Sequence, residues 1–238
     1  YLHLGPKAPV QNEAAVRNAL ALFGSTSPSY LILQSLDKCS QYLAEGYPLR
    51  LAKCCGVLTH LRQALNEAAQ AAGAAFPLAL DGPAREPMKL TLDAAALGLT
   101  GRQLAETLRQ NQMECEYADP RYVVLMFTPE NPAQDYERLF AALEPLCKAF
   151  TAPAVLPEEH REQFAALAQQ AKPRCTVRQA VFAPQETIPA AKALGRICAM
   201  PTVSCPPAIP LVVSGEEIGP AALELFAAYG VETVSVIQ

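Results

Sequence analysis

The chain has 238 residues, of which 51% are hydrophobic and 18% charged, with a formal net charge of −4. At about 150 residues per domain, this length predicts one large domain or two smaller ones. The apolar content excludes a disordered or collagen-like chain. The weak negative charge gives no electrostatic reason to expect nucleic acid or a membrane as partner, and no apolar run approaches the roughly 20 residues that span a bilayer. Because the chain starts at Tyr1 without an initiator methionine, we expect a fragment of a longer protein.

Cysteine and histidine are the residue types that would indicate a metal site or a disulfide scaffold. The eight cysteines include no C-x-x-C pair, and the three histidines are scattered along the chain. The sequence therefore predicts neither a zinc site nor a disulfide framework. Most of the cysteines stand among Leu, Val and Ala, which indicates small buried thiols in a reducing compartment, so we expect a cytoplasmic protein.

The first third of the chain is predicted to be helical. Asn12 is suited to cap a helix that extends to Leu22. A second helix is expected from Pro28 to about residue 45, with Ser27 as its N-cap. A third begins at Pro48 and fades near residue 73, with apolar residues at helical spacing along it.

The middle of the chain alternates between strand and helix patterns. Residues 88–92 and 122–127 have the composition of strands, and 113–118 are a weaker strand candidate. Thr100 to Gln103 has the form of a capping box, which starts a helix, and Pro132 opens another. This order of elements predicts a small α+β layer, in which helices pack on one face of a sheet.

The last third is expected to contain three helices and two strands. The helices are predicted at 157–171, 189–194 and 220–229, and the strands at 211–213 and 231–237. The three prolines in the segment 206–210 remove three backbone donors, which excludes regular helix or central sheet there.

The run Ser25-Thr26-Ser27-Pro28-Ser29 is the most informative local feature of the sequence. Its hydroxyls precede a predicted helix, whose first turn offers unpaired N–H groups and the positive end of a dipole. That arrangement suits a phosphate. The same residues also suit an ordinary well-capped helix start, and the pattern alone leaves both interpretations open.

Carboxylates supply two weaker candidates. A rigid proline loop leads to Ser214-Gly215-Glu216-Glu217, where Glu216 could meet a cationic ligand. Proline-rich surface loops are common, so the pattern alone favours an ordinary loop. Glu114 and Glu116 alternate along the predicted strand and so share one face, as on any solvated strand. No nucleophile-elbow, P-loop, dinucleotide-binding or H-E-x-x-H motif is present.

Four segments, in order, resemble the bacterial ornithine/lysine/arginine decarboxylases. They are Ser25–Tyr30 continuing through Leu36-Asp37; Lys89–Asp93 with Gly98–Gly101; Glu116–Asp119 followed by Val123–Phe127; and Gly195–Ile197 with Pro206–Pro210 and Gly215-Glu216. Together they span the chain from Tyr1 to about Tyr229. Two positions depart from the family pattern, since Ala208 replaces a glycine and Ser214 replaces a proline.

The resemblance implies a pyridoxal-phosphate enzyme of the aspartate-aminotransferase fold type I, and an α/β fold with an α+β small domain. Residues 1–75 would be the end of the large cofactor-binding domain with connecting helices. Residues 76–150 would be the small domain, a sheet with helices on one face. Residues 151–238 would be the family's small C-terminal α/β domain. We expect a homodimer that acts on a basic amino acid.

The resemblance also implies roles for particular residues. Ser25, Thr26, Ser27 and Ser29 would help to hold the cofactor phosphate, and Glu216 would lie near the substrate path. The family's Schiff-base lysine follows a histidine in a Ser-x-His-Lys motif, and none of the lysines here follows a histidine. We therefore expect no catalytic residue in this chain and no activity from it alone. A non-catalytic paralogue, a regulatory or oligomerisation module, and an independent binding module are the competing hypotheses.

Overall fold

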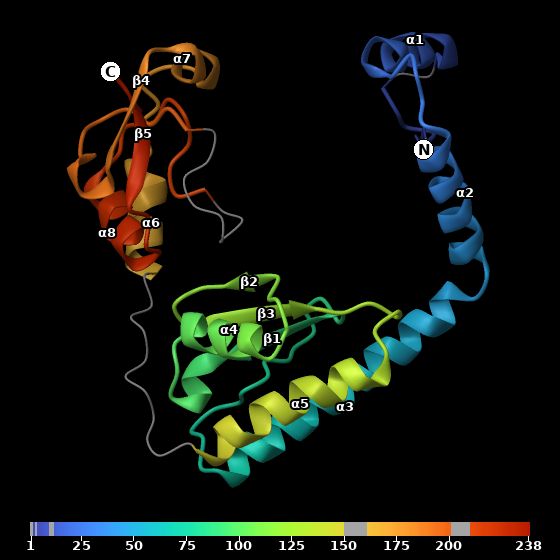
Figure 1. Ribbon diagram of the computed structural model, residues 1–238. Helices are drawn as coiled ribbons and strands as arrows, with labels where there is room; N and C mark the ends of the chain where they lie inside the picture. Colours follow the sequence, from blue (N-terminus) through green and yellow to red (C-terminus); the bar gives the residue numbers. More distant parts are fainter. Residues whose placement is uncertain (1, 3, 10–11, 150–160, 201–209) are drawn as a thin grey trace. The chain divides into compact units, whose positions relative to one another are not determined.

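A computed structural model describes residues 2, 4–9, 12–149, 161–200 and 210–238. It divides into two compact units, Tyr1–Leu51 and Ala52–Gln238, and each is described by itself. The fold is mixed α/β, with helices and two small antiparallel sheets, as the sequence predicted (Figure 1). No helix among the described residues is long and apolar enough to cross a membrane.

The first unit consists of helices. The first, α1, spans Glu13–Phe23, and the Asn12 side chain accepts hydrogen bonds from the Ala14 and Ala15 N–H groups, as predicted. The second, α2, spans Tyr30–Ala44 and has Ser29 at its N-cap. It thus begins two residues later than predicted, and Ser27 is not the cap. The physical reason is a local turn, in which the Ser27 N–H donates to the Ser25 hydroxyl at 3.1 Å.

Helix α3 spans Tyr47–Ala71 and buries one face. The buried apolar residues of that face recur at helical spacing and belong to the core of the neighbouring sheet: Cys54, Leu58, Leu61, Leu65 and Ala69. Arg62, on the same helix, is also buried and donates to the Pro87 and Lys89 carbonyls at 2.9 and 2.8 Å. The helix is therefore tied to the sheet by both packing and hydrogen bonds.

The first sheet has three antiparallel strands in the order β1-β3-β2, which span Lys89–Asp93, Tyr122–Met126 and Tyr117–Ala118. Leu90 pairs with Leu125 and Leu92 with Val123, so the apolar residues of β1 and β3 lie on the core face. The predicted strand 113–118 is shorter than expected, because only its last two residues form a ladder.

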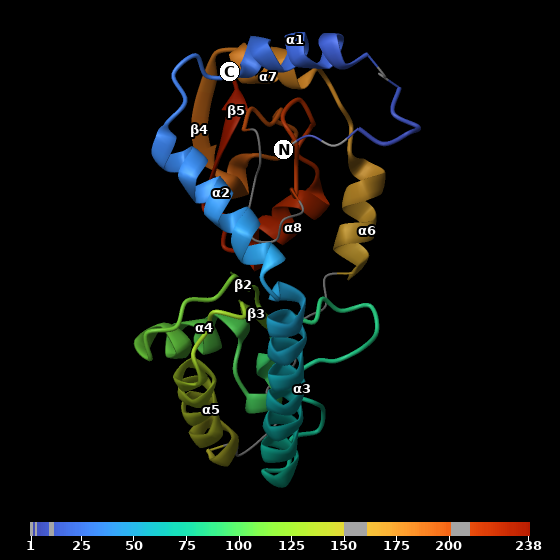
Figure 2. The same ribbon diagram turned by 90° about the vertical axis from the view of Figure 1, so that its right-hand side faces the viewer.

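Three helical elements accompany this sheet: the 3₁₀ turn η1 (Ala94–Leu97), α4 (Gly101–Gln110) and α5 (Ala133–Lys148). The predicted capping box is present at the start of α4, where Thr100 and Gln103 exchange hydrogen bonds. Helices α3 and α5 lie side by side below the sheet (Figures 1 and 2). The Cys54 thiol on α3 contacts the Tyr136 hydroxyl on α5 at 3.3 Å.

The last part of the chain has its own apolar core, formed by residues such as Ile218, Phe226 and Val234. Its elements are α6 (Arg161–Gln170), α7 (Val177–Phe182), β4 (Gln185–Pro189), the 3₁₀ turn η2 (Ala190–Lys192), α8 (Pro220–Ala228) and β5 (Thr233–Ile237). Strands β4 and β5 pair antiparallel. The predicted last helix and last strand are confirmed.

Two predictions in this part are wrong. The helix expected at 189–194 is the end of β4 followed by a single 3₁₀ turn, because Pro189 pairs with Thr233 in the ladder. The strand expected at 211–213 is a bend: Leu211 and Val212 are buried in the core without a ladder partner. Residues 157–160 of the predicted helix and 206–209 of the proline segment lie outside the described residues.

Candidate functional site

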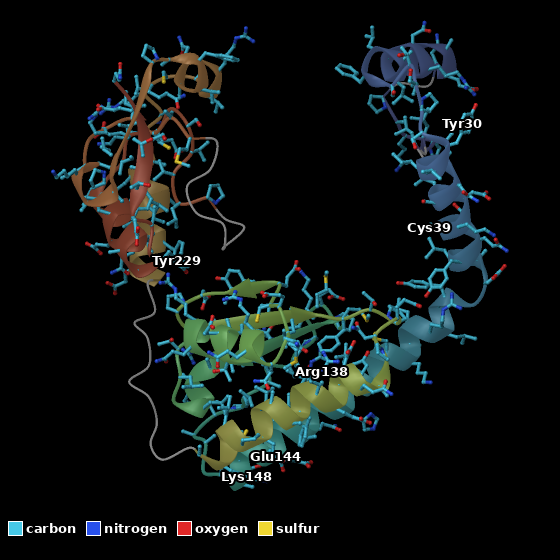
Figure 3. All side chains as sticks on the ribbon, viewed as in Figure 1. Tyr30, Cys39, Arg138, Glu144, Lys148 and Tyr229 are labelled. Atoms are coloured by element: carbon cyan, nitrogen blue, oxygen red, sulfur yellow. The ribbon has the colours of Figure 1, made fainter. Side chains whose placement is uncertain are left out.

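The hydroxyl run lies at the start of α2 and is exposed throughout. Figure 3 labels Tyr30, the first residue of the helix. Ser29 occupies the N-cap, yet its side chain makes no capping bond, so the first-turn N–H groups are not satisfied by that hydroxyl. Ser25, Thr26, Ser27 and Ser29 thus lie in the segment that leads into the positive end of the α2 dipole. These residues fit a phosphate group.

Lysine is the residue type that a Schiff base requires, and all lysines of this chain are described. Each is exposed except Lys89, which is half-buried and lies 3.6 Å from the Glu116 carboxylate. Lys148 pairs with Glu144 at 3.0 Å near the end of α5 (Figure 3). None has the enclosed, desolvated surroundings in which a lysine becomes a nucleophile.

Glu216 belongs to a turn that its own carboxylate closes. Its Oε2 accepts a hydrogen bond from the Val213 N–H at 2.9 Å. Gly215 precedes it with φ +90°, and a Cβ there would collide with the Cys175 carbonyl, so only glycine fits. The Ser214 hydroxyl donates to the Met200 carbonyl. The hydrogen bond from Val213 gives Glu216 a structural role in this turn. Its other carboxylate oxygen, Oε1, is the one that could meet a ligand.

The other family-like motifs also have structural roles. A Cβ at Gly101 would collide with the Asp119 and Tyr122 carbonyls, so the start of α4 packs against the β2–β3 turn. The Asp119 carboxylate holds that turn by accepting the Arg121 and Tyr122 N–H groups at 2.7 and 2.6 Å. Arg121 in turn pairs with the buried Asp93 at 2.8 Å. These residues hold the backbone of the β2–β3 turn and the start of α4 in place. Their geometry gives no indication of a catalytic or ligand-binding role.

The carboxylates and thiols described in this paragraph also have ordinary structural surroundings. Glu114 is exposed and pairs with Arg109 at 3.1 Å, as expected for a solvated face. Burial raises the pKa of the Cys115, Cys147 and Cys198 thiols, so they stay protonated at neutral pH. The described cysteines are all free, and the described part of the chain gathers no group of three His, Cys, Asp or Glu that could hold a metal ion.

A pocket beside the three-stranded sheet was missed by the sequence analysis. It has a volume of about 240 Å³ and is lined by residues 112–114, residues 125–127 and the first two turns of α5. Because these three segments are separated along the chain, no motif spacing could have found it. Gln112 follows α4 at a position where glycine is usual, but this is apparent only once the end of the helix and the positive φ are known.

A family model matches the last part of the chain. Residues 157–230 match the model described as the Orn/Lys/Arg decarboxylase C-terminal domain. This segment is therefore similar to the C-terminal domain of the Orn/Lys/Arg decarboxylases. The resemblance stated from the sequence motifs is thereby confirmed for the family.

Curated proteins extend the likeness along the chain. The arginine decarboxylase of Bacillus subtilis is 31% identical over 207 residues, which are 85% of this chain and 41% of that protein. The arginine decarboxylase of Bacillus cereus is 28% identical over 221 residues, covering 89% of this chain and 46% of that protein. The chain thus spans less than half the length of these curated relatives.

Solved structures share the fold of the chain. The constitutive lysine decarboxylase of Escherichia coli matches with a TM-score of 0.66 at 16% identity, over 95% of this chain and 46% of that one. Lysine decarboxylase A of Pseudomonas aeruginosa matches with a TM-score of 0.66 at 19% identity, over 92% of this chain and 40% of that one. At this identity the likeness concerns the fold alone.

Proposed function

We propose that this chain is the C-terminal part of a pyridoxal-phosphate-dependent decarboxylase, which converts a basic amino acid to its amine and carbon dioxide. The observation that carries the proposal is the cluster of exposed hydroxyls at the N-terminus of α2, in a chain similar to arginine decarboxylases over 85% of its length. The names of the curated relatives favour arginine as the substrate over lysine and ornithine.

The cofactor would be held at its phosphate by this chain. Ser25, Thr26, Ser27 and Ser29 would donate hydroxyl hydrogen bonds, together with the first N–H groups of α2. When bound, pyridoxal phosphate supplies an electron sink for the pair left as carbon dioxide departs. The residues of this chain would orient the cofactor, and the lysine that attaches it covalently would lie in another part of the enzyme.

Two further elements of the proposal concern the substrate and the partner. Glu216 would face the cationic substrate with the carboxylate oxygen that Val213 does not use. The chain would form a homodimer through the exposed apolar residues of α2, which include Ile32, Leu36 and Leu43. The free thiols fit a cytoplasmic, reducing environment.

The test has two arms. Reading the coding sequence upstream of Tyr1 should show a Ser-x-His-Lys motif in frame, and the protein containing it should release carbon dioxide from arginine. An upstream sequence without that lysine would contradict the catalytic proposal and favour a non-catalytic paralogue. The 238-residue chain, mixed with pyridoxal phosphate, should give no turnover above the free cofactor. Turnover by this chain alone would contradict the assignment of the lysine to another segment.

A further inference from the structure

The pocket beside the three-stranded sheet has an apolar floor and a charged rim. Leu125, Phe127 and Leu139 form buried parts of the floor, while the Met126 side chain beside them is 55% exposed. A volume of about 240 Å³ exceeds the roughly 150 Å³ cavity that holds benzene, so a ligand of about ten non-hydrogen atoms fits. Of these residues Met126 offers the most exposed apolar surface, against which an aliphatic chain could pack.

The rim carries opposite charges on different walls. Glu114 lies on the wall formed by residues 112–114, and only its Oε1 takes part in the pair with Arg109. Asp135 and Arg138 lie on the α5 wall. Their contact is long, at 3.5 Å, and the Arg138 side chain is 48% exposed, so the pair holds the guanidinium weakly. Arg138 can therefore receive an anionic group.

The charges of the rim do not cancel. Glu114 and Asp135 against Arg138 leave one negative charge at the pocket. Arg109 would neutralise Glu114, but it is shared with Glu106 at 2.8 Å, so the wider cluster keeps the same balance. A ligand of net charge +1 would complement it.

Gln112 provides an independent observation. It is the non-glycine residue with positive φ, at 60°, among the described residues. It ends α4 in a Schellman arrangement, in which the Met113 N–H donates to the Leu108 carbonyl and the Gln112 N–H to the Arg109 carbonyl. Glycine is favoured at this position, yet the chain places there a long amide that lines the pocket. Unfavourable backbone conformations of this kind are concentrated at binding sites.

We propose that this pocket binds a small amphoteric molecule of net charge +1, whose carboxylate meets Arg138 and whose distal cation meets Glu114. Its aliphatic middle would lie over Phe127 and Met126, and the Gln112 amide would bond to it at the rim. Basic α-amino acids have this chemistry. The site consists of residues of this chain alone, so it stands or falls independently of the proposed catalytic activity.

The four methionines of the chain allow a direct test by NMR of the full 238-residue protein with ¹³C-labelled methionine methyl groups. Met113 and Met126 line the pocket, whereas Met88 and Met200 do not. Titration with L-arginine or L-lysine should shift the Met113 and Met126 signals, with a dissociation constant of about 0.1–1 mM, and leave the other two in place. No shift at 20 mM ligand, or equal shifts at all four methyl groups, would overturn the proposal.

Ligand analogues test the two ends of the molecule. Agmatine keeps the guanidinium but lacks the carboxylate, and norleucine keeps the carboxylate but lacks the distal cation. Each should bind about fivefold more weakly than arginine or worse, because one charge-assisted contact is lost. If either analogue bound as tightly as arginine, the amphoteric ligand class would be wrong.

Matched variants test the residues. Arg138→Leu and Glu114→Gln should each weaken arginine binding by about fivefold or more. Lys148→Met and Glu144→Gln, towards the other end of the same helix, should leave binding unchanged, because neither side chain lines the pocket. Gln112→Gly should raise the melting temperature and still weaken binding, an opposite pair of effects that a structural role does not predict. Unchanged binding in both Arg138→Leu and Glu114→Gln would overturn the site.

Discussion

Two consecutive helices, α2 and α3, have opposite surroundings. Both carry apolar residues at helical spacing, but α3 has six buried residues and α2 has none. On α2, Ile32, Leu36 and Leu43 are exposed by 63, 48 and 48%. The apolar face of α3 packs on the sheet of its own unit, whereas nothing in the described first unit covers that of α2. A periodic pattern shows that a face is apolar, but it does not show what covers it.

This contrast explains how the two regions relate to function. The three-stranded sheet with its helices and the last part of the chain each have a buried apolar core, and their motif glycines and carboxylates hold the fold. The α2 segment has no core of its own, and its hydroxyl run is exposed. We therefore expect the first unit to be completed by a partner, and the cofactor-binding role proposed for it to depend on that partner.

The largest effect should come from truncating a buried residue of α3. Leu58 is 0% exposed, so Leu58→Ala should lower the free energy of unfolding by about 2–5 kcal/mol, because it leaves a cavity. Leu36→Ala on α2 should change the free energy of unfolding of the dilute chain by less than about 0.5 kcal/mol. Urea denaturation of both variants checks the contrast; equal losses would contradict it.

The next effect concerns the start of α2. In the complete enzyme, Thr26→Ala with Ser27→Ala should weaken cofactor binding by about 1.5–3 kcal/mol for each hydroxyl removed, because each loses a charge-assisted hydrogen bond to the phosphate. Neither side chain caps the helix, so the melting temperature of the cofactor-free form should change little. Ser35→Ala, which removes only a bond to the Leu31 carbonyl, is the matched control. Equal cofactor affinity in the double variant and the wild type would exclude the phosphate role.

A smaller effect is expected on association. If α2 is the dimer surface, Ile32→Glu with Leu36→Glu should raise the dissociation constant at least tenfold, which is about 1.4 kcal/mol. Light scattering over a dilution series measures it. Leu194→Glu changes a leucine that is 57% exposed outside the first unit, and should leave the dissociation constant unchanged. Association that is insensitive to the α2 variant would place the interface elsewhere.

The smallest effect is on alkaline stability. Burial, together with the hydrogen bond to Asp119, raises the pKa of the Tyr117 phenol above its ordinary value. As the pH rises past about 10, the unfolded chain therefore ionises before the folded one, and stability falls. Because Tyr117 is partly exposed, its share should be below about 1 kcal/mol per pH unit. Tyr117→Phe should make the decline shallower, whereas Tyr30→Phe on α2 should not; melting curves between pH 8 and 11.5 would show it.

Local sequence signals predicted those helices whose first turn is capped by a nearby side chain. Asn12 and the Thr100–Gln103 capping box marked helix starts that the structure confirms. A capping box of the same form, Thr176 with Gln179, starts α7 and was overlooked. Strand β4 could not be predicted, because its mostly polar residues are fixed by pairing with β5, which is distant in the sequence. Leu211 and Val212 were predicted as a strand for the opposite reason. They are buried without a ladder partner, and burial alone gives the same apolar pattern as a strand.

The two candidate sites, the hydroxyl run and the pocket, also differ in whether local sequence could predict them. The hydroxyl run is contiguous, so the sequence alone could indicate a phosphate site there. The pocket brings together residues 112–114, residues 125–127 and Arg138, which only the folded chain places side by side. Gln112 could not be recognised as unusual before the end of α4 and its positive φ were known.

The contrast between α2 and α3 is tested most directly by native-state hydrogen exchange, measured by mass spectrometry at about 1 and 100 μM protein. Peptides from α3 should be strongly protected at both concentrations, because the face of that helix is buried within its own unit. Peptides from residues 30–44 should exchange rapidly at the low concentration and gain protection only when the chain associates. Protection of α2 equal to that of α3 in the dilute chain would contradict the account, because α2 would then need no partner.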